Sequence, residues 1–282
     1  MKTLMQYTMS TLAVCLLALA WAATGHCESP AEIRILTYNI HHGEGVDGMF
    51  DLPRIARVIK SASPHLVALQ EVDQGTRRAG GVDQPAELAR LTSMEIVFSR
   101  NIDYEGGGYG TAVLSRLPIR SHESVKLRSF YDGTDAHPEQ RGVQLVEVAP
   151  ADGATLLFLC THLDYRPPDA ERMESARTIN RLAEKHADKL MILAGDLNAT
   201  PESRVLAEFA KRWKIAGARP AADDDAKPLL TFPSRKPDRW IDYVLVRPAE
   251  RWEVVEARVL DEPVASDHRP LLAVLRLIGS KD

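Results

Sequence analysis

The sequence has no excess of positive charge. Its 35 Lys and Arg residues are outnumbered by 39 Asp and Glu residues, which gives a formal net charge of −4 over 282 residues. A mildly acidic protein lacks the general electrostatic attraction that drives non-specific binding to nucleic acid. This counts against DNA as the main substrate, although a local basic patch could still bind it.

Long hydrophobic runs are also missing, apart from one near the N-terminus at residues 11–23 (TLAVCLLALAWAA). That run is too short to span a bilayer comfortably, follows a positive charge at Lys2 and ends in small residues, as is typical of a secretory signal peptide. An uncleaved N-terminal anchor is the alternative interpretation. We predict a signal peptide at residues 1–27, and a domain at residues 28–282 that is periplasmic or secreted and has no stable membrane span.

Cysteine is scarce. Cleavage is expected near residues 22–27, so no cysteine besides Cys27 and Cys160 is expected in the mature chain. Export permits a disulfide between these two residues, but two cysteines do not establish one. Cys160 lies in an apolar run, so we interpret it as a small buried hydrophobic residue.

No linker, low-complexity tract or internal repeat divides the chain after residue 27, which favours one α/β domain. Short apolar runs bounded by turn formers or charges are typical of strands. Such runs occur at residues 33–38, 65–70, 111–115, 143–148, 155–160, 189–194, 241–246, 252–259 and 271–277. Helical spacing of apolar residues predicts one helix capped by Asp51 and others within residues 168–185 and 201–213. Because strands and helices do not alternate regularly, we expect helices that cover sheets, and not a purely parallel sheet.

Polar side chains recur where the predicted strands begin or end. A lone Asp after a strand is usually a turn residue or a helix cap, but six such clusters are hard to explain in that way. Rigid strands whose ends converge can hold polar groups accurately enough for catalysis. The residues in these clusters are Asn39, Glu71, His162, Asp164, Asp196, Asn198, Asp242, Asp267 and His268.

The chemistry of these clusters indicates a site for a divalent metal. Hard oxygen ligands suit Mg²⁺, Mn²⁺ or Ca²⁺, whereas zinc prefers more His and Cys. Glu71 is the first candidate ligand, with help from Asn39 and Asp267. His268 follows Asp267 directly, and a His–carboxylate pair fixes the imidazole tautomer for acid–base work. A hydrogen-bonded structural histidine is the alternative for His268.

Six short motifs in these clusters resemble those of the endonuclease/exonuclease/phosphatase superfamily, and they occur in the same order. They are TYNI (37–40), LQEV (69–72), THLD (161–164), GDLN (195–198), IDY (241–243) and SDHRP (266–270). One of them alone would be a weak match, but six in order are specific. The resemblance implies a four-layered α/β sandwich of the DNase I-like type, with two mixed β-sheets packed together and helices outside. It also implies metal-dependent hydrolysis of a phosphoester.

The resemblance implies roles for individual residues as well. Asn39 and Glu71 would bind the metal, and Asp267 would join them directly or through water. Asp196 would orient or deprotonate the attacking water, and Asn198 would contact phosphoryl oxygens.

The histidines are expected to act on the phosphate. By the same resemblance, His268 would stabilise developing charge while Asp242 holds it, and His162 would contact the scissile phosphate from the other side. Phosphoryl transfer needs positioning and charge neutralisation more than covalent help, so this division of roles is chemically reasonable.

Four residues are assigned to substrate binding. Tyr109 would face the substrate, although simple packing is an alternative, and Asp164 belongs to the THLD motif. Arg141 resembles a family arginine that faces the substrate, with a surface arginine as the alternative. Arg235 belongs to a basic loop with Lys236 and Arg239, just before Asp242, that could hold an extra phosphate or an anionic head group.

The substrate class follows from charge and size. We predict a monomer that hydrolyses a phosphodiester or phosphomonoester of a small molecule or lipid head group, with Mg²⁺, or Mn²⁺ or Ca²⁺, as cofactor. The segment after Glu71 resembles that of small bacterial and lipid-related members more than that of DNA-repair enzymes. A secreted nuclease is the first alternative, and a catalytically silent protein that binds phosphorylated ligands is the second.

Overall fold

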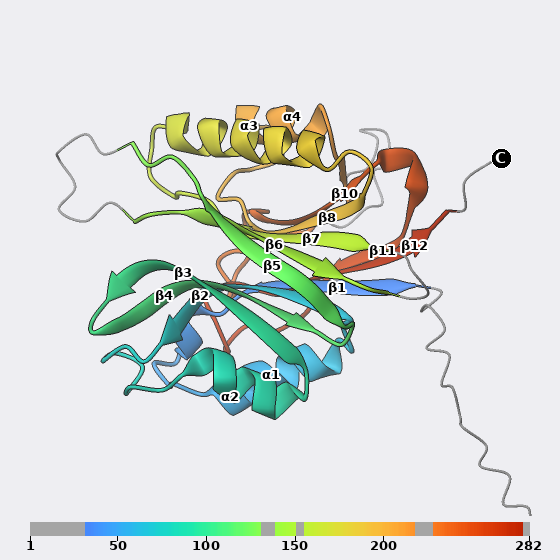
Figure 1. Ribbon diagram of the computed structural model, residues 1–282. Helices are drawn as coiled ribbons and strands as arrows, with labels where there is room; N and C mark the ends of the chain where they lie inside the picture. The colour runs from blue at the N-terminus through green and yellow to red at the C-terminus, as the bar shows by residue number, and fades with distance from the viewer. Residues whose placement is uncertain (1–31, 131–138, 151–154, 218–227, 279–282) are drawn as a thin grey trace, which may run out of the picture.

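The computed structural model describes residues 32–130, 139–150, 155–217 and 228–278. The predicted signal peptide and Cys27 lie outside these ranges, so cleavage and the possible disulfide stay predictions. Within these ranges two six-stranded sheets pack face to face, with helices on both outer faces (Figure 1). The four-layered sandwich of two mixed sheets is thereby confirmed.

The first sheet has the strand order β11-β12-β1-β2-β4-β3. Only β1 and β2 run parallel to each other, and the other pairs are antiparallel. The strands are β1 (Ile33–Asn39), β2 (Leu66–Gln74), β3 (Glu95–Tyr104), β4 (Gly107–Ser115), β11 (Trp252–Val259) and β12 (Leu271–Leu277).

The second sheet has the order β5-β6-β7-β8-β10-β9 and again contains one parallel pair, β7 with β8. Its members are β5 (Ile119–Lys126), β6 (Gly142–Val148), β7 (Leu156–His162), β8 (Leu190–Asp196), β9 (Lys214–Ile215) and β10 (Asp242–Arg247). All nine predicted strands are present, but β3, β5 and β9 were not predicted. The reason is clearest for β5, whose side chains are mostly exposed and polar and therefore form no apolar run.

The main core lies between the two sheets. Buried side chains such as Ile35 and Val113 from the first sheet meet Phe158 and Val244 from the second. Cys160 belongs to this core and is fully buried, which confirms its interpretation as a small hydrophobic residue.

Two further cores form under the helices. On the first sheet lie α1 (Leu52–Ser61) and α2 (Gln84–Thr92), and on the second lie α3 (Ala170–Lys185) and α4 (Arg204–Ala210) (Figure 1). Asp51 caps α1 as predicted, because its side chain accepts a hydrogen bond from the backbone N–H of Arg54 at 2.8 Å. Among the described residues, no helix is both long enough and apolar enough to cross a membrane.

Gly195 allows β7 and β8 to approach closely, just before both strands end at the polar cluster. It pairs with Thr161, and a Cβ at Gly195 would collide with the Thr161 carbonyl oxygen. Gly195→Ala is therefore expected to lower the free energy of unfolding by about 2–3 kcal/mol, as overpacking does, in urea denaturation. Gly142→Ala is the control, since the atom nearest to its Cβ is the movable end of the Asn101 side chain, at 2.8 Å, and the Val125 carbonyl oxygen lies at an ordinary contact distance of 3.5 Å. Equal losses in both variants would contradict this account.

Candidate active site

Strand pairing brings the predicted polar residues together at one edge of the sandwich. His162 ends β7 and lies beside Asp196, which ends β8. Asp242 begins the antiparallel strand β10 and pairs with Asp196 from the other side. Asn39 ends β1 in the facing sheet, and its side-chain nitrogen donates to the Asp196 carboxylate at 3.2 Å. Residues from both sheets therefore converge on Asp196.

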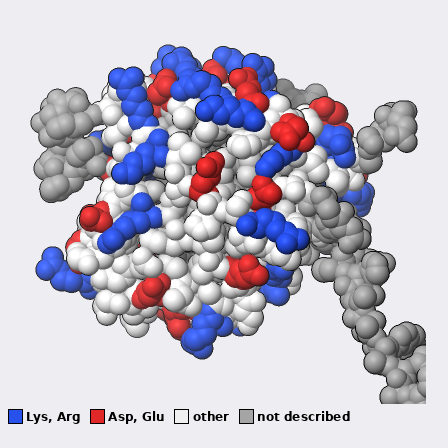
Figure 2. Space-filling model, in the orientation of Figure 1, with Lys and Arg blue, Asp and Glu red and all other residues white. Residues whose placement is uncertain are grey.

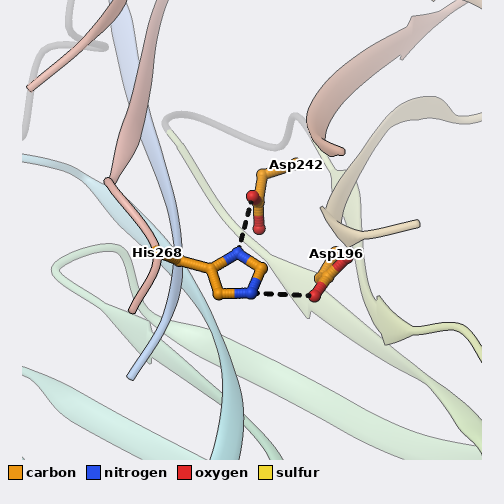
Figure 3. A group of neighbouring side chains, drawn as sticks. All are labelled: Asp196, Asp242 and His268. Carbon is orange, nitrogen blue, oxygen red and sulfur yellow. Dashed lines mark hydrogen bonds and ion pairs between the residues drawn. The ribbon is translucent and has the colours of Figure 1, made fainter. Parts of the chain in front are cut away.

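His268 lies between the two aspartates (Figure 3). Its Nδ1 is 2.9 Å from Oδ2 of Asp242, and its Nε2 is 3.6 Å from Oδ2 of Asp196. The loop that carries it is fixed by Ser266, whose hydroxyl donates to the Asn39 carbonyl at 2.8 Å and accepts from the His268 N–H at 3.2 Å. The imidazole is thus held in a single orientation with Nε2 directed at Asp196.

The charges in this group shift the pKa values of Asp196 and His268. Burial disfavours the imidazolium, but the carboxylates of Asp242 and Asp196 outweigh it and raise the pKa of His268 to about 10. The pKa of Asp196 is also raised, first because the carboxyl is buried and second because Asp242 repels its negative charge. The site therefore combines an imidazolium at neutral pH with a carboxylate that accepts a proton more readily than an ordinary Asp.

His162 approaches Asp196 from the opposite side. Its Nε2 is 3.5 Å from Oδ2 of Asp196, and its Nδ1 is 3.0 Å from a guanidinium nitrogen of Arg141. Burial, then the positive charges of Arg141 and His268, hold the pKa of His162 well below its usual value. Asn198 completes this side, because its backbone N–H donates to Oδ1 of Asp196 at 2.9 Å and its side-chain nitrogen lies 3.2 Å from Nε2 of His162.

Glu71 occupies an irregular position in β2. The pairing with β4 shifts between Leu69 and Val72, and Glu71 has a φ of 56°, which is unusual for a residue with a side chain. Such strain is commonly found at functional sites. The bulge turns the Glu71 carboxylate towards the cluster, where it accepts a hydrogen bond from the Asn39 side chain at 2.9 Å.

The donor set fits a hard divalent cation. Glu71 and Asp267 both line the cavity described below and offer carboxylate oxygens, the ligands that such ions prefer. The side-chain oxygen of Asn39 instead accepts the backbone N–H of His41 at 3.0 Å, so in this structure Asn39 orients Glu71. Its direct ligation of a metal stays a prediction.

A second group of potential ligands comprises Asp196, Asp242 and His268, whose ligand atoms lie within 4.8 Å of one another. In this group, however, the imidazole is hydrogen-bonded to Asp242 and carries a proton on each nitrogen at neutral pH. A protonated ring cannot bind a metal. We therefore interpret these three residues as an ion-paired group, and Glu71 with Asp267 as candidate ligands for a cation.

The cluster opens into a cavity of about 520 Å³. That size suits a small phosphorylated molecule or a head group. Its lining includes six predicted site residues besides Glu71 and Asp267, namely Tyr109, Arg141, His162, Asp196, Asn198 and His268. The predicted residues Asn39 and Asp242 lie beneath the lining, where they hold Glu71 and His268.

Two predicted substrate residues are engaged elsewhere. The buried carboxylate of Asp164 accepts from the Arg166 side chain at 2.8 Å. Arg235 is exposed and donates to the Val46 carbonyl at 2.9 Å. Neither residue is part of the cavity lining, so their contact with substrate stays a prediction.

Several lining residues were not assigned to the site from the sequence. Arg239, from the same basic loop as Arg235, lies over the ring of Phe232 at 4.5 Å, and that ring packs against His268 at 4.7 Å. The others are Glu139, Tyr165, Thr200 and Ile241. The sequence pointed to two of these residues: Ile241 belongs to the IDY motif, and Arg239 belongs to the basic loop, which did not distinguish it from Arg235.

Comparison with known proteins agrees with the geometry. YbhP, an uncharacterized protein of Escherichia coli K12, is 28% identical over 261 residues, which cover 86% of this chain and 96% of YbhP. An endonuclease/exonuclease/phosphatase family protein from Bacteroides thetaiotaomicron superposes with a TM-score of 0.72 at 16% identity, over 89% of this chain and 99% of that one. The mannosyl-6-phosphatase Bt3783 of the same species gives 0.69 at 17% identity, over 86% and 99%. Both likenesses confirm the fold that the motifs implied.

The family itself is established by sequence. The model of the Endonuclease/Exonuclease/phosphatase family matches residues 36–268, which is most of the chain and includes all the motif residues that surround Asp196 except the last two of SDHRP. Members of this family hydrolyse phosphoesters, in general with a divalent metal. This protein belongs to the endonuclease/exonuclease/phosphatase family.

Proposed function

We propose that this protein is an exported, Mg²⁺-dependent hydrolase that cleaves a phosphoester of a small molecule or lipid head group as a monomer outside the cytoplasm. The observation that carries the proposal is the buried Asp196 carboxylate, flanked by His162 and His268 and placed in the same cavity as Glu71 and Asp267. Such a cavity provides a base, two imidazole groups for the phosphate and carboxylates for a cation.

Each side chain has a task that follows from its surroundings. Asp196, whose pKa is raised by burial, orients a water molecule and accepts its proton. The His268 imidazolium neutralises charge that develops on the phosphoryl oxygens, and Asp242 keeps it charged and oriented. Glu71 and Asp267 would hold the metal, which supplies Lewis-acid stabilisation of oxygen charge when bound.

The mildly acidic balance of charge, with 35 Lys and Arg against 39 Asp and Glu, supports a small substrate over a nucleic acid. Acidic and basic side chains are interspersed on the face shown in Figure 2 and form no continuous basic surface there. The size of the cavity suits a small phosphorylated molecule. A secreted nuclease is therefore the less favoured alternative.

The proposal is tested with purified protein on a panel of p-nitrophenyl phosphate, bis-p-nitrophenyl phosphate, sugar and inositol phosphates, phospholipids and DNA. We expect turnover that depends on Mg²⁺ or Mn²⁺, is abolished by EDTA and is fastest on one of the small esters or lipids. Faster cleavage of DNA, with a steep decline as salt rises, would support the nuclease instead. Binding without turnover of any ester would support a catalytically silent phosphate-binding protein.

Glu71→Gln tests the metal assignment. Losing one carboxylate charge is expected to raise the Mg²⁺ concentration for half-maximal activity by about 10-fold or more, because affinity for hard cations depends on ligand charge. Excess Mg²⁺ should restore part of the activity. Glu123→Gln, on the exposed face of β5, is the matched control and should not change the metal requirement. An unchanged Mg²⁺ requirement in Glu71→Gln would place the metal elsewhere.

A further inference from the structure

The two imidazoles beside Asp196 have opposite partners. The Nε2 atoms of His268 and His162 lie 3.6 and 3.5 Å from the same oxygen, Oδ2 of Asp196. Behind them, Nδ1 of His268 meets the Asp242 carboxylate at 2.9 Å, whereas Nδ1 of His162 meets the Arg141 guanidinium at 3.0 Å. A carboxylate accepts a hydrogen bond from a ring N–H, whereas a guanidinium can only donate a hydrogen bond to a ring nitrogen.

The partner at Nδ1 therefore decides where His162 carries its proton. A neutral imidazole has one N–H and one lone pair, and since Arg141 has no acceptor, Nδ1 must supply the lone pair. The proton then lies on Nε2, and this N–H faces the Asp196 carboxylate, which can act as its acceptor. A second proton, on Nδ1, would place the ring N–H against the N–H of Arg141 and would put two positive charges side by side. The ring therefore stays neutral.

One other donor competes for the lone pair of His162. The side-chain nitrogen of Asn198 lies 3.2 Å from Nε2, which favours the opposite tautomer. One N–H of that nitrogen donates to the Leu163 carbonyl at 3.0 Å, and only the other could reach Nε2. A neutral amide is, however, a weaker donor than a charged guanidinium. The shorter, charge-assisted bond from Arg141 therefore prevails.

Arg141 is itself held in place. Its side chain is 2% exposed, and the same nitrogen that meets His162 lies 2.6 Å from the Glu139 carboxylate. Its backbone carbonyl accepts from the Leu127 N–H at 2.9 Å and from the Gln140 side chain at 2.8 Å. Although Arg141 borders the cavity, the nitrogen closest to the site is thus already shared between two protein partners.

We propose that Arg141, anchored by Glu139, is a positioning residue that fixes His162 as the neutral tautomer with its proton on Nε2. His162 then offers an N–H to a phosphoryl oxygen, and Nε2 cannot accept a proton from water. That task is left to Asp196 alone. The catalytic meaning of this arrangement rests on the proposed function, whereas the tautomer is a property of the protein without substrate.

The tautomer is measured directly by long-range ¹H–¹⁵N correlation spectra of protein labelled with ¹⁵N-histidine, in which His162→Gln identifies the His162 signals. At pH 7 we expect one protonated nitrogen, Nε2, and one unprotonated nitrogen, Nδ1. A proton on Nδ1, or on both nitrogens, would overturn the proposal whether or not any ester is hydrolysed. The tautomer itself is read from the wild-type spectrum, and His162→Gln serves only to assign the signals.

Variants of Arg141 then test the cause. Arg141→Met should turn the His162 signals into a mixture of tautomers, whereas Arg141→Lys, which keeps a charged donor, should preserve the Nε2–H form. Should Arg141→Met fail to fold, Glu139→Gln provides the test, because a loosened Arg141 should leave a detectable fraction of the other tautomer. An unchanged Nε2–H pattern in folded Arg141→Met, or in Glu139→Gln where Arg141→Met does not fold, would overturn the role of Arg141.

Kinetics separate positioning from substrate binding. On the best ester of the panel, Arg141→Met is expected to lower kcat by about 10-fold or more with little change in KM, because a positioned donor acts in the transition state. Arg141→Lys should recover most of the loss. A rise in KM at unchanged kcat would instead mean that Arg141 binds the substrate directly.

Discussion

Replacing Asp196 with Asn is expected to lower kcat by about 10³- to 10⁴-fold without lowering the melting temperature of the protein. The loss follows because an amide cannot accept the proton of the attacking water, and general base catalysis is worth about 10²- to 10⁴-fold. The amide is nearly isosteric with the carboxyl, and its oxygen still accepts from the Asn198 N–H. Its nitrogen would face the Asn39 donor at the position of Oδ2, a cost that we expect the removal of a buried charge to offset.

The stability part of this expectation follows from the sign of the pKa shift. The pKa of Asp196 is raised in the folded protein, so its charged form is less favourable there than in the unfolded chain. Above the ordinary carboxyl pKa this costs stability, and the cost grows as the pH rises towards the folded pKa. A neutral Asn removes that cost at pH 8.

A buried carboxylate with a structural role provides the control. Asp73 accepts two bonds from Arg78, at 2.6 and 2.9 Å, and one from Thr76 at 2.7 Å. Asp73→Asn should therefore lower the melting temperature, because it weakens a buried ion pair. Differential scanning fluorimetry at pH 8 and initial rates on the best ester measure both effects. A lower melting temperature in Asp196→Asn would mean that Asp196 supports the fold, contrary to our account.

Removing the imidazolium should have the second-largest effect. His268→Gln is expected to lower kcat by about 10²- to 10³-fold, the range for loss of one group that stabilises transition-state charge. Asp242→Asn should act on the same group, since Asp242 holds and charges His268. The double variant should therefore lose little more than His268→Gln alone, because residues that act as a unit are not additive.

The pH dependence distinguishes charge from mere orientation. His268 has a raised pKa of about 10, so its positive charge is present at neutral pH and is lost only as the pH rises through that value. Without the Asp242 carboxylate the pKa falls, and the charge is lost at a lower pH. The alkaline decline of kcat in Asp242→Asn should therefore move towards neutral pH. An alkaline limb identical to that of the wild type would show that His268 acts without its charge.

Much of the fold could be predicted from local pattern because the buried strands are apolar and end abruptly. Each of the nine predicted runs became a strand, and Asp51 caps the first helix. Two of the three strands that escaped prediction, β5 and β9, lack such a pattern. Strand β9 consists of two residues only, Lys214–Ile215. Strand β5 lies at the edge of its sheet, and most of its side chains are polar and exposed. Their formation depends on the neighbouring strand and not on their own composition.

The sequence by itself was enough to identify the family motifs and the carboxylate, amide and imidazole groups that meet in the site. This was possible because the residues of each motif are adjacent in the chain. Only the tertiary structure decided which groups touch. Asn39 reaches Asp196 across 157 positions, and Arg141 meets His162 across 21. These contacts depend on the order and register of strands in two sheets, which no local pattern encodes. The protonation of each histidine follows from those contacts, since the partner at Nδ1 decides the charge.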